Sequence, residues 1–248
     1  MSGHSKWATI KHKKGAADAK RGQVFTKLIR EITVAARHGG GDPNANPRLR
    51  LVIEKAREAN MPKDNVDKAI KRGTGELEGI TYEEVTYEAY GHGGVALYIE
   101  ALTDNKNRTT AEVRNLLTKR GGNMAGAGAT AWLFHKKGYL LVEKGKAEEE
   151  RLMTLALEAG AEDFKSEGSS YEIITDQKVF EAVKQALAQA KIPTSSAELT
   201  MLPTSTVRVD GADAKQVLAL VEALEEHDDV QHVYANFDIP DEILAQIA

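Results

Sequence analysis

The spacing of the hydrophobic residues changes near residue 82, and this change constrains the fold more than any other feature of the chain. Before it, one apolar stripe recurs at the helical spacing i, i+3, i+4, i+7 and i+11, formed by Phe25, Leu28, Ile29, Ile32 and Ala36. After it, residues 84–90 and 95–102 read as β-strands around the glycine-rich segment 91–94, a pattern typical of a hairpin. The chain is therefore expected to begin with helices and to continue with mixed helices and strands.

Three helices are predicted in the first part. Gly39–Gly41 ends the first helix, because glycines often follow the last turn of a helix. Asn46 and Pro47 begin the second, as the N-cap and the first helical residue. A third, short helix lies within residues 62–73. We therefore predict a basic, all-α domain with an N-terminal arm over residues 1–79.

The remainder of the chain contains one ferredoxin-like pattern inside another. Its inner part has the order βαββαβ, with strands at 138–143, 162–166, 170–175 and 196–202 and helices at 147–159 and 177–190. The flanking sequence repeats this order in two halves, with strands at 95–102 and 130–135 around helix 109–120, and strands at 205–209 and 229–236 around helix 213–225.

The predicted fold class is therefore α+β. A small all-α N-terminal domain is followed by two ferredoxin-like βαββαβ domains, one inserted into the other. The outer domain is discontinuous and comprises residues 80–136 and 204–248, and the inserted domain comprises residues 137–203.

Charge is divided unevenly along the chain, although the formal net charge is only −4. Residues 1–75 hold 17 Lys or Arg and seven Asp or Glu, so this part carries +10, and the remainder carries −14. A basic first third favours contact with a polyanion such as nucleic acid. Segregation of charge for solubility is the alternative.

Several function classes are disfavoured by what the sequence lacks. The chain has no cysteine, which excludes disulfides, thiolate zinc sites and cysteine nucleophiles. No apolar run reaches the ~18–20 residues of a membrane span, and the first residues lack the apolar core of a signal peptide. No histidine has metal-ligand spacing with a carboxylate, and no nucleophile motif occurs. We expect a cytoplasmic protein that is not an enzyme and has no metal site, cofactor or small-molecule substrate.

The candidate nucleic-acid-binding residues are the cations of the arm and helices together with one tryptophan. Lys and Arg neutralise phosphates, and an aromatic ring can stack on an unpaired base. The predicted set is Lys6, Trp7, Lys11, Lys13, Lys14, Lys20, Arg21, Lys27, Arg30, Arg37, Lys71 and Arg72. In the alternative interpretation, Trp7 and Ile10 anchor the arm to the helical domain.

A secondary polar site is predicted at Lys106 and Arg108, at the start of a helix where phosphate can bind. The capping residues of 103–109 more simply serve to begin that helix. The glycine-rich loop 121–128 matches no phosphate-binding motif and is expected to be flexible.

Long motifs of this chain resemble the YebC/PmpR family. They are G-H-S-K-W-A-T-I-K-H-K-K-G at 3–15, F-T-K-L-I-R-E-I-T-V-A-A-R at 25–37, G-G-G-D-P-N-A-N-P-R-L-R at 39–50, M-P-K-D-N-V at 61–66, A-I-K-R-G-T-G at 69–75, Y-E-A-Y-G-H-G-G-V-A at 87–96 and L-T-D-N-K-N-R-T at 102–109. The sequence departs from the family's usual pattern at residues 125–134.

The resemblance implies a helical N-terminal domain and two α/β domains around a central cleft. It also implies a DNA-binding transcriptional regulator, since bacterial members are generally described in this way. A related mitochondrial protein activates translation of cytochrome oxidase, and bacterial relatives have been tied to the ribosome. No metal, nucleotide cofactor or catalytic residue is implied.

Together these observations predict a nucleic-acid-binding regulator of gene expression that acts on DNA. The first alternative is a translation factor that binds ribosomal RNA or the ribosome and eases synthesis of proline-rich stretches. The second is a protein-interaction module without direct nucleic-acid contact. No membrane partner is expected.

Overall fold

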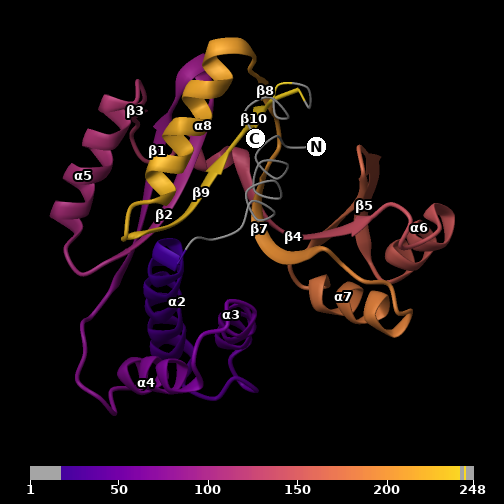
Figure 1. Cartoon of the computed structure of the whole chain (residues 1–248), viewed down its shortest axis with the longest axis horizontal. Helices are drawn as coiled ribbons and strands as arrows, with labels where there is room; N and C mark the ends of the chain where they lie inside the picture. The colour runs from indigo at the N-terminus through magenta and orange to yellow at the C-terminus, as the bar shows by residue number, and fades with distance from the viewer. Residues whose placement is uncertain (1–17, 241–242, 244–248) are drawn as a thin grey trace. The chain divides into compact units, whose positions relative to one another are not determined.

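The computed structural model describes residues 18–240 and residue 243, which divide into two compact units. One unit contains residues 132–206, and the other contains the described residues on either side of that segment. Figure 1 shows helices alone in the first described part of the chain, and sheets with further helices in the rest. The prediction of an α+β fold, with a helical N-terminal region followed by antiparallel sheets, is confirmed.

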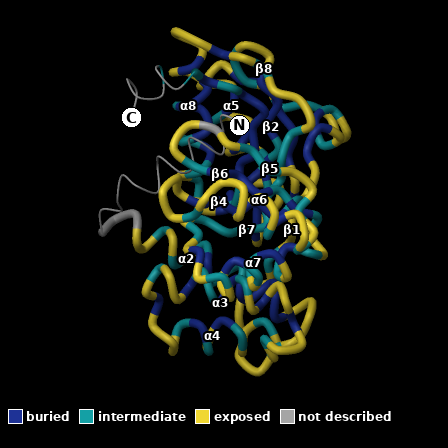
Figure 2. Tube along the Cα trace, turned by 90° about the vertical axis from the view of Figure 1, so that its right-hand side faces the viewer, coloured by how far each residue is buried: buried dark blue, intermediate teal, exposed yellow. Residues whose placement is uncertain are grey.

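The helical region contains α2 (Asp18–Gly39), α3 (Pro47–Glu58) and α4 (Lys63–Thr74). Buried and exposed positions alternate along these helices (Figure 2), as an amphipathic pattern requires. Their shared core contains Leu28 and Ile32 of α2, Leu49 and Ile53 of α3, and Val66 of α4. The apolar stripe predicted from helical spacing is therefore the buried side of α2.

Two residues fix how these helices pack. The buried Asn46 side chain accepts a hydrogen bond from the Leu49 amide (3.1 Å) and donates to the carbonyls of Ala35 (2.8 Å) and Gly40 (2.9 Å). It thus caps α3 and also ties α3 to the end of α2. Gly73 lies where α4 meets α2, and a Cβ there would be 2.4 Å from the carbonyl oxygen of Thr33.

The first sheet has the order β3-β1-β2-β9, with antiparallel pairing throughout. Its strands are β1 (Glu83–Tyr90), β2 (Ala96–Thr103), β3 (Asn123–Met124) and β9 (Val230–Ala235). A 3₁₀ turn, η1 (His92–Gly94), joins β1 to β2, as the predicted hairpin requires. Side chains from β1, β2 and β9 form one apolar core with α5 (Lys106–Lys119) and α8 (Gly211–Glu225).

The strand composition of this sheet differs from the prediction in two places. Residues 131–133 form a 3₁₀ turn, η2 (Ala131–Leu133), and not part of a strand 130–135. The predicted strand 205–209 is reduced to β8 (Val207–Arg208), which pairs in parallel with β10 (Phe237–Asp238) outside the four-stranded sheet. The position beside β2 that a ferredoxin-like order reserves for β8 is taken by β1. The tight hairpin explains this, because closing its short connection costs little entropy.

The second unit follows the predicted βαββαβ order. It contains β4 (Phe134–Glu143), α6 (Glu149–Glu158), β5 (Ala161–Glu167), β6 (Ser170–Asp176), α7 (Phe180–Gln189) and β7 (Ser196–Pro203). The sheet order β5-β6-β4-β7 places the first and third strands at the centre, as in ferredoxin-like folds. Gly138 of β4 has no room for a side chain, since a Cβ there would lie 2.2 Å from Thr175 Oγ1.

Candidate nucleic-acid interface and the Asp229 cluster

Five of the predicted nucleic-acid-binding residues, Lys6, Trp7, Lys11, Lys13 and Lys14, lie outside the described residues. Lys20 and Arg21 lie in the first turn of α2, and the exposed Arg21 guanidinium is 5.5 Å from the centre of the Phe25 ring. The arm's predicted role therefore remains a prediction.

The basic stripe of α2 contacts other parts of the chain. The Lys27 ammonium donates to the backbone carbonyl of Glu225 (2.5 Å). Arg30 donates to the carbonyl of Asp228 (2.6 Å) and to the carboxylate of Asp229 (2.6 Å). Periodicity identifies the side of a helix that faces away from its own core, but it cannot show whether a second layer covers that side.

Arg37, farther along α2, is exposed but also has partners. Its guanidinium donates to Thr81 Oγ1 (2.8 Å) and to the Tyr82 carbonyl (3.4 Å). These bonds tie the end of α2 to the segment that leads into β1.

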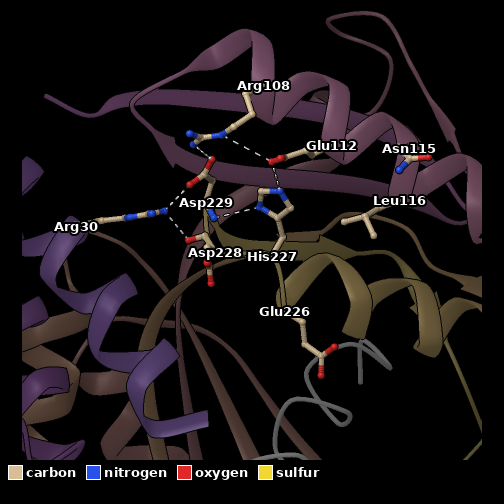
Figure 3. Close-up of a pocket in the computed structure, with 9 residues that line it drawn as sticks. All are labelled: Arg30, Arg108, Glu112, Asn115, Leu116, Glu226, His227, Asp228 and Asp229. Carbon is tan, nitrogen blue, oxygen red and sulfur yellow. Dashed lines mark hydrogen bonds and ion pairs between the residues drawn. The ribbon is translucent and has the colours of Figure 1, made fainter. Parts of the chain in front are cut away.

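Asp229 is the centre of the best-defined polar cluster in the described residues (Figure 3). It lies between α8 and β9, and its side chain is only 3% exposed. One carboxylate oxygen accepts from Arg30, whereas the other accepts from Arg108 (2.7 Å) and Thr109 (2.6 Å) of α5 and from Thr103 of β2 (3.2 Å). A single carboxylate thus joins the helical region to the first sheet and its helix α5.

The protonation state of Asp229 follows from these bonds. Burial raises the pKa of this carboxyl. Hydrogen bonds from Thr109, Arg108 and Arg30 lower the pKa by a larger amount, so it falls to about 2. Asp229 therefore remains ionised at neutral pH, and its charge is balanced by two guanidinium groups.

The predicted secondary polar site at Lys106 and Arg108 is placed at the start of α5. Asn105 caps this helix by accepting from the Arg108 amide (3.1 Å), which agrees with the capping interpretation of this segment. The Arg108 side chain contacts two carboxylates, those of Asp104 (2.8 Å) and Asp229, whereas Lys106 is exposed. Arg108 therefore contributes to the Asp229 cluster, and the structure does not bring Lys106 into it.

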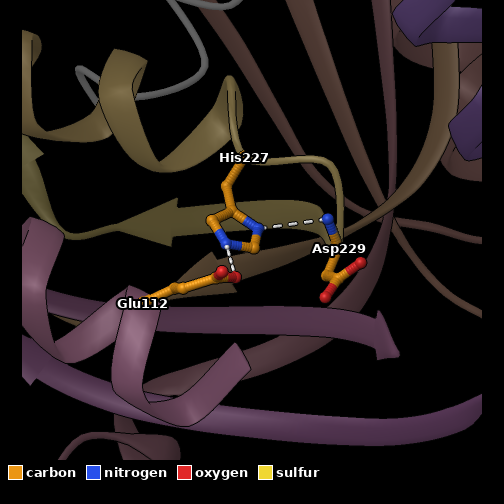
Figure 4. Close-up of side chains that lie close together, drawn as sticks. All are labelled: Glu112, His227 and Asp229. Atoms are coloured by element: carbon orange, nitrogen blue, oxygen red, sulfur yellow. Dashed lines mark hydrogen bonds and ion pairs between the residues drawn. The ribbon is translucent and has the colours of Figure 1, made fainter. Parts of the chain in front are cut away.

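Glu112, His227 and Asp229 form the one group of three potential metal ligands that the described residues contain (Figure 4). The Asp229 amide donates to His227 Nδ1 (3.1 Å), so that nitrogen is an acceptor and His227 Nε2 carries the proton shared with Glu112 (3.0 Å). The carboxylate of Asp229 already binds two arginines, whose charges would repel a cation. The donor set therefore fits a hydrogen-bonded chain better than a metal site.

A cavity of about 590 Å³ lies beside this cluster and is lined by Arg30, Arg108, Glu112, Asn115, Leu116, Glu226, His227, Asp228 and Asp229. Its walls carry charges of both signs (Figure 3). No sequence motif singles out Asp229, because it ends an acidic stretch of the kind that commonly forms a solvated helix face. Its place immediately before an apolar strand was the one available signal.

A second buried carboxylate organises the glycine-rich loop. Glu88 of β1 accepts from the amides of Gly128 (2.6 Å), Thr130 (2.5 Å) and Ala131 (2.7 Å). Burial raises the pKa of Glu88, but these hydrogen bonds outweigh that effect and lower it below the usual glutamate value. The last residue of the loop predicted to be flexible, Gly128, and the segment directly after it are held to the first sheet by these three charge-assisted hydrogen bonds.

Apart from Arg48, which forms an ion pair with Glu84, six exposed lysines and arginines lie on α3 and α4. We call them the outer cations: Arg50, Arg57, Lys63, Lys68, Lys71 and Arg72. Among residues 18–240 and 243, none of the six forms an ion pair, although Arg50 donates weakly to the Pro43 carbonyl (3.4 Å). Lys71 and Arg72, both predicted from sequence, therefore present charged groups to solvent.

The helices of the described residues include none long and apolar enough to cross a membrane.

Known proteins and protein-family models match nearly the whole chain. Family models described as the TACO1/YebC protein N-terminal domain and the TACO1/YebC second and third domain match residues 5–76 and 82–237. A probable transcriptional regulatory protein of Geobacter sulfurreducens is 57% identical over 247 residues and all of both chains. A second protein of that description, from Natranaerobius thermophilus, is 56% identical over 98% of this chain and 99% of its own.

The fold is also similar to a solved structure. The crystal structure of a conserved hypothetical protein from Aquifex aeolicus has a TM-score of 0.80 and 50% identity, covering 92% of this chain and 94% of that one. The chain belongs to the TACO1/YebC family.

Proposed function

We propose that this protein is a nucleic-acid-binding regulator of gene expression that acts on DNA in the cytoplasm, without catalytic activity of its own. The observation that carries the proposal is the set of outer cations, which have no ion-pair partner among the described residues. Unpaired lysines and arginines on a small helical region suit phosphate contact. The names of the relatives, probable transcriptional regulatory proteins, support the regulatory role.

The chemistry of the outer cations also indicates the kind of binding. Lysine and arginine on exposed helix flanks grip phosphates, whereas reading a sequence requires several side chains aimed together at base edges. The exposed face of α4 carries Asp64 and Asp67 beside its cations, which weakens its attraction for any polyanion. We therefore expect moderate affinity, strong salt dependence and little discrimination by the helical region alone.

The proposal is tested by fluorescence anisotropy with labelled duplex DNA over a series of salt concentrations. The variant Lys71→Gln/Arg72→Gln removes two outer cations. If both touch phosphate, the salt slope falls by roughly 1.8 for duplex DNA. The control Lys119→Gln/Lys215→Gln removes the same charge from exposed positions on α5 and α8. Equal losses in both variants would show that only net charge matters and would refute a binding surface on α4.

RNA is the alternative target, through the stacking of Trp7 and the lysines of the arm, which lie outside the described residues. Single-stranded RNA of the same sequence is therefore measured in parallel. A clear preference for RNA would overturn the DNA assignment and favour a ribosome-associated translation factor. Absence of binding to either nucleic acid at low salt would favour a protein-interaction module.

A further inference from the structure

Polar side chains on the basic side of α2 contact the carboxyl end of helix α8 and the turn that follows it. Gln23 donates to the Glu226 carbonyl, Lys27 to the Glu225 carbonyl, and Arg30 to the Asp228 carbonyl and the Asp229 carboxylate. The last carbonyls of a helix have no partners within the helix and carry the negative end of its dipole. Residues 225–229, which we call the acidic turn, therefore present to α2 three backbone carbonyls and one carboxylate, oxygens that accept from cations as phosphate oxygens do.

The helical region and the first sheet share several further polar contacts. Besides the acidic turn, they include His232 with Glu31 (3.4 Å) and Arg48 with Glu84. The buried apolar residues of the helical region and those of the sheet form two separate clusters. Val34, one turn after Arg30, is also buried (1% exposed) and belongs to neither cluster. The polar contacts are the part of this association that salt and competing ions weaken.

These observations bear on the predicted binding residues Lys27 and Arg30. Their spacing on one side of α2 suits a row of phosphates, but the acidic turn now fills that position. Arg30 is only 14% exposed, so it cannot meet a phosphate unless the turn moves away.

We propose that the acidic turn is an autoinhibitory latch, which covers a second polyanion-binding face on α2 and is displaced by a polyanion. Asp229 is its principal contact, because it neutralises Arg30 while Arg108 and Thr109 hold it in place. Displacement gives Arg30 a phosphate in place of a carboxylate, and Lys27 a phosphate in place of a backbone carbonyl. The inference deepens the proposed function and rests on it for the identity of the natural polyanion.

The latch is tested by distance measurement within the full chain. The protein has no cysteine, so Glu58→Cys on α3 and Lys119→Cys on α5 provide the only two thiols for spin labels. Both positions are exposed and neither belongs to the latch. Double electron–electron resonance should give one main distance at low salt, and heparin, used as a generic polyanion, should add a longer one.

Three variants separate the latch from a general change in charge. Asp229→Asn and Arg30→Gln should each populate the longer distance without heparin. Arg30→Gln leaves the bonds from Arg108 and Thr109 to Asp229 in place. It therefore tests the latch even if Asp229→Asn does not fold. Asp228→Asn is the matched control, since it removes the same charge one residue away and keeps the carbonyl that accepts from Arg30. It should behave as the parent.

One unchanged distance in Arg30→Gln and in the parent with heparin would overturn the latch. The same samples are measured with duplex DNA, whose binding is followed separately by anisotropy. DNA that binds without changing the distance supports the proposed function and refutes the latch. DNA that does not bind, while heparin still lengthens the distance, refutes the proposed function and supports the latch.

Discussion

Replacing Asp229 by asparagine tests the central polar contact of the larger unit. The two side chains have nearly the same shape, so the change acts mainly through charge and hydrogen bonding. An asparagine presents one oxygen and one NH₂ group. If its oxygen keeps the bonds to Arg108 and Thr109, its NH₂ group faces the Arg30 guanidinium, and two donors oppose each other. In the reverse orientation Arg108 and Thr109 lose their acceptor.

The magnitude follows from the pKa of Asp229, which the folded structure lowers from 3.8 to about 2. This difference of nearly two units corresponds to about 2.5 kcal/mol of stability, at about 1.36 kcal/mol per unit. The side chain is almost fully buried, so solvent screens little of this energy. A mostly buried arginine without its carboxylate adds a further cost. We expect Asp229→Asn to lower the free energy of unfolding by roughly 2–4 kcal/mol.

The pH dependence gives an independent check. Because the pKa of Asp229 is lower in the folded state than in the unfolded state, its contribution is complete above about pH 4 and is lost as the pH falls toward 2. The difference in stability between parent and Asp229→Asn should therefore be the same at pH 7 and at pH 5, which are test conditions chosen well above that range.

Urea unfolding followed by circular dichroism measures these free energies, and Asp228→Asn is again the control. The exposed Asp228 side chain has no ion pair within the described part of the chain, so its loss should change stability by less than about 0.5 kcal/mol. The reasoning is refuted if the two variants are equally stable, or if the effect of Asp229→Asn already shrinks between pH 7 and pH 5.

Three further substitutions, the first with a matched control, test packing and polar contacts elsewhere in this unit. Gly73→Ala forces a Cβ to within 2.4 Å of the Thr33 carbonyl oxygen and should cost about 1–3 kcal/mol in urea unfolding. Gly22→Ala, with open space around the new methyl group, should instead be neutral or stabilising by up to about 1 kcal/mol, and similar losses in both would contradict the packing argument. Glu88→Gln loses the charge that holds the glycine-rich loop and should cost about 1–3 kcal/mol. Because the pKa of Glu88 is lowered on folding, this cost should persist down to about pH 4.3 and decrease only below it. Asn46→Asp keeps the cap oxygen but loses both donated hydrogen bonds, so its Tm should fall, and an unchanged Tm would show that those bonds contribute nothing.

The helices and the inserted sheet could be predicted because their signals are local. The start of α3 needs only Asn46 and Pro47, and the end of α2 needs only the glycines that follow it. In the inserted unit all strands and helices come from one continuous segment and follow one another after short connections, so the βαββαβ order is visible in the sequence.

The first sheet could be predicted only in part, because its strands come from both sides of the insertion. Two topologies fit the same pattern, one with β8 beside β2 and one with β1 there. Strand propensity does not distinguish them, since it describes single segments and not their pairing. The short hairpin at residues 91–94 is visible in the sequence and favours β1 beside β2, but the position of β8 depends on packing across the whole domain.

The polar cluster could not be predicted, since its members come from three separate parts of the chain. Arg30 lies in α2, Thr103 and Arg108 lie at the end of β2 and in the first turn of α5, and Asp229 follows α8. Each has an ordinary local explanation as a helix face, a cap or an acidic run. Only the tertiary fold brings Arg30, Thr103 and Arg108 together around the buried carboxylate of Asp229.

The charge asymmetry of the sequence therefore needs a narrower interpretation. A basic first third and an acidic remainder suggest an external polyanion, but part of that opposite charge is matched inside the chain. Arg30 meets Asp229, Arg48 meets Glu84, and Lys27 meets the carboxyl end of α8. These cations cannot be counted as phosphate ligands while the contacts persist. Among the described residues, the outer cations are therefore the groups that favour nucleic-acid binding, and replacing them leaves the buried contacts intact.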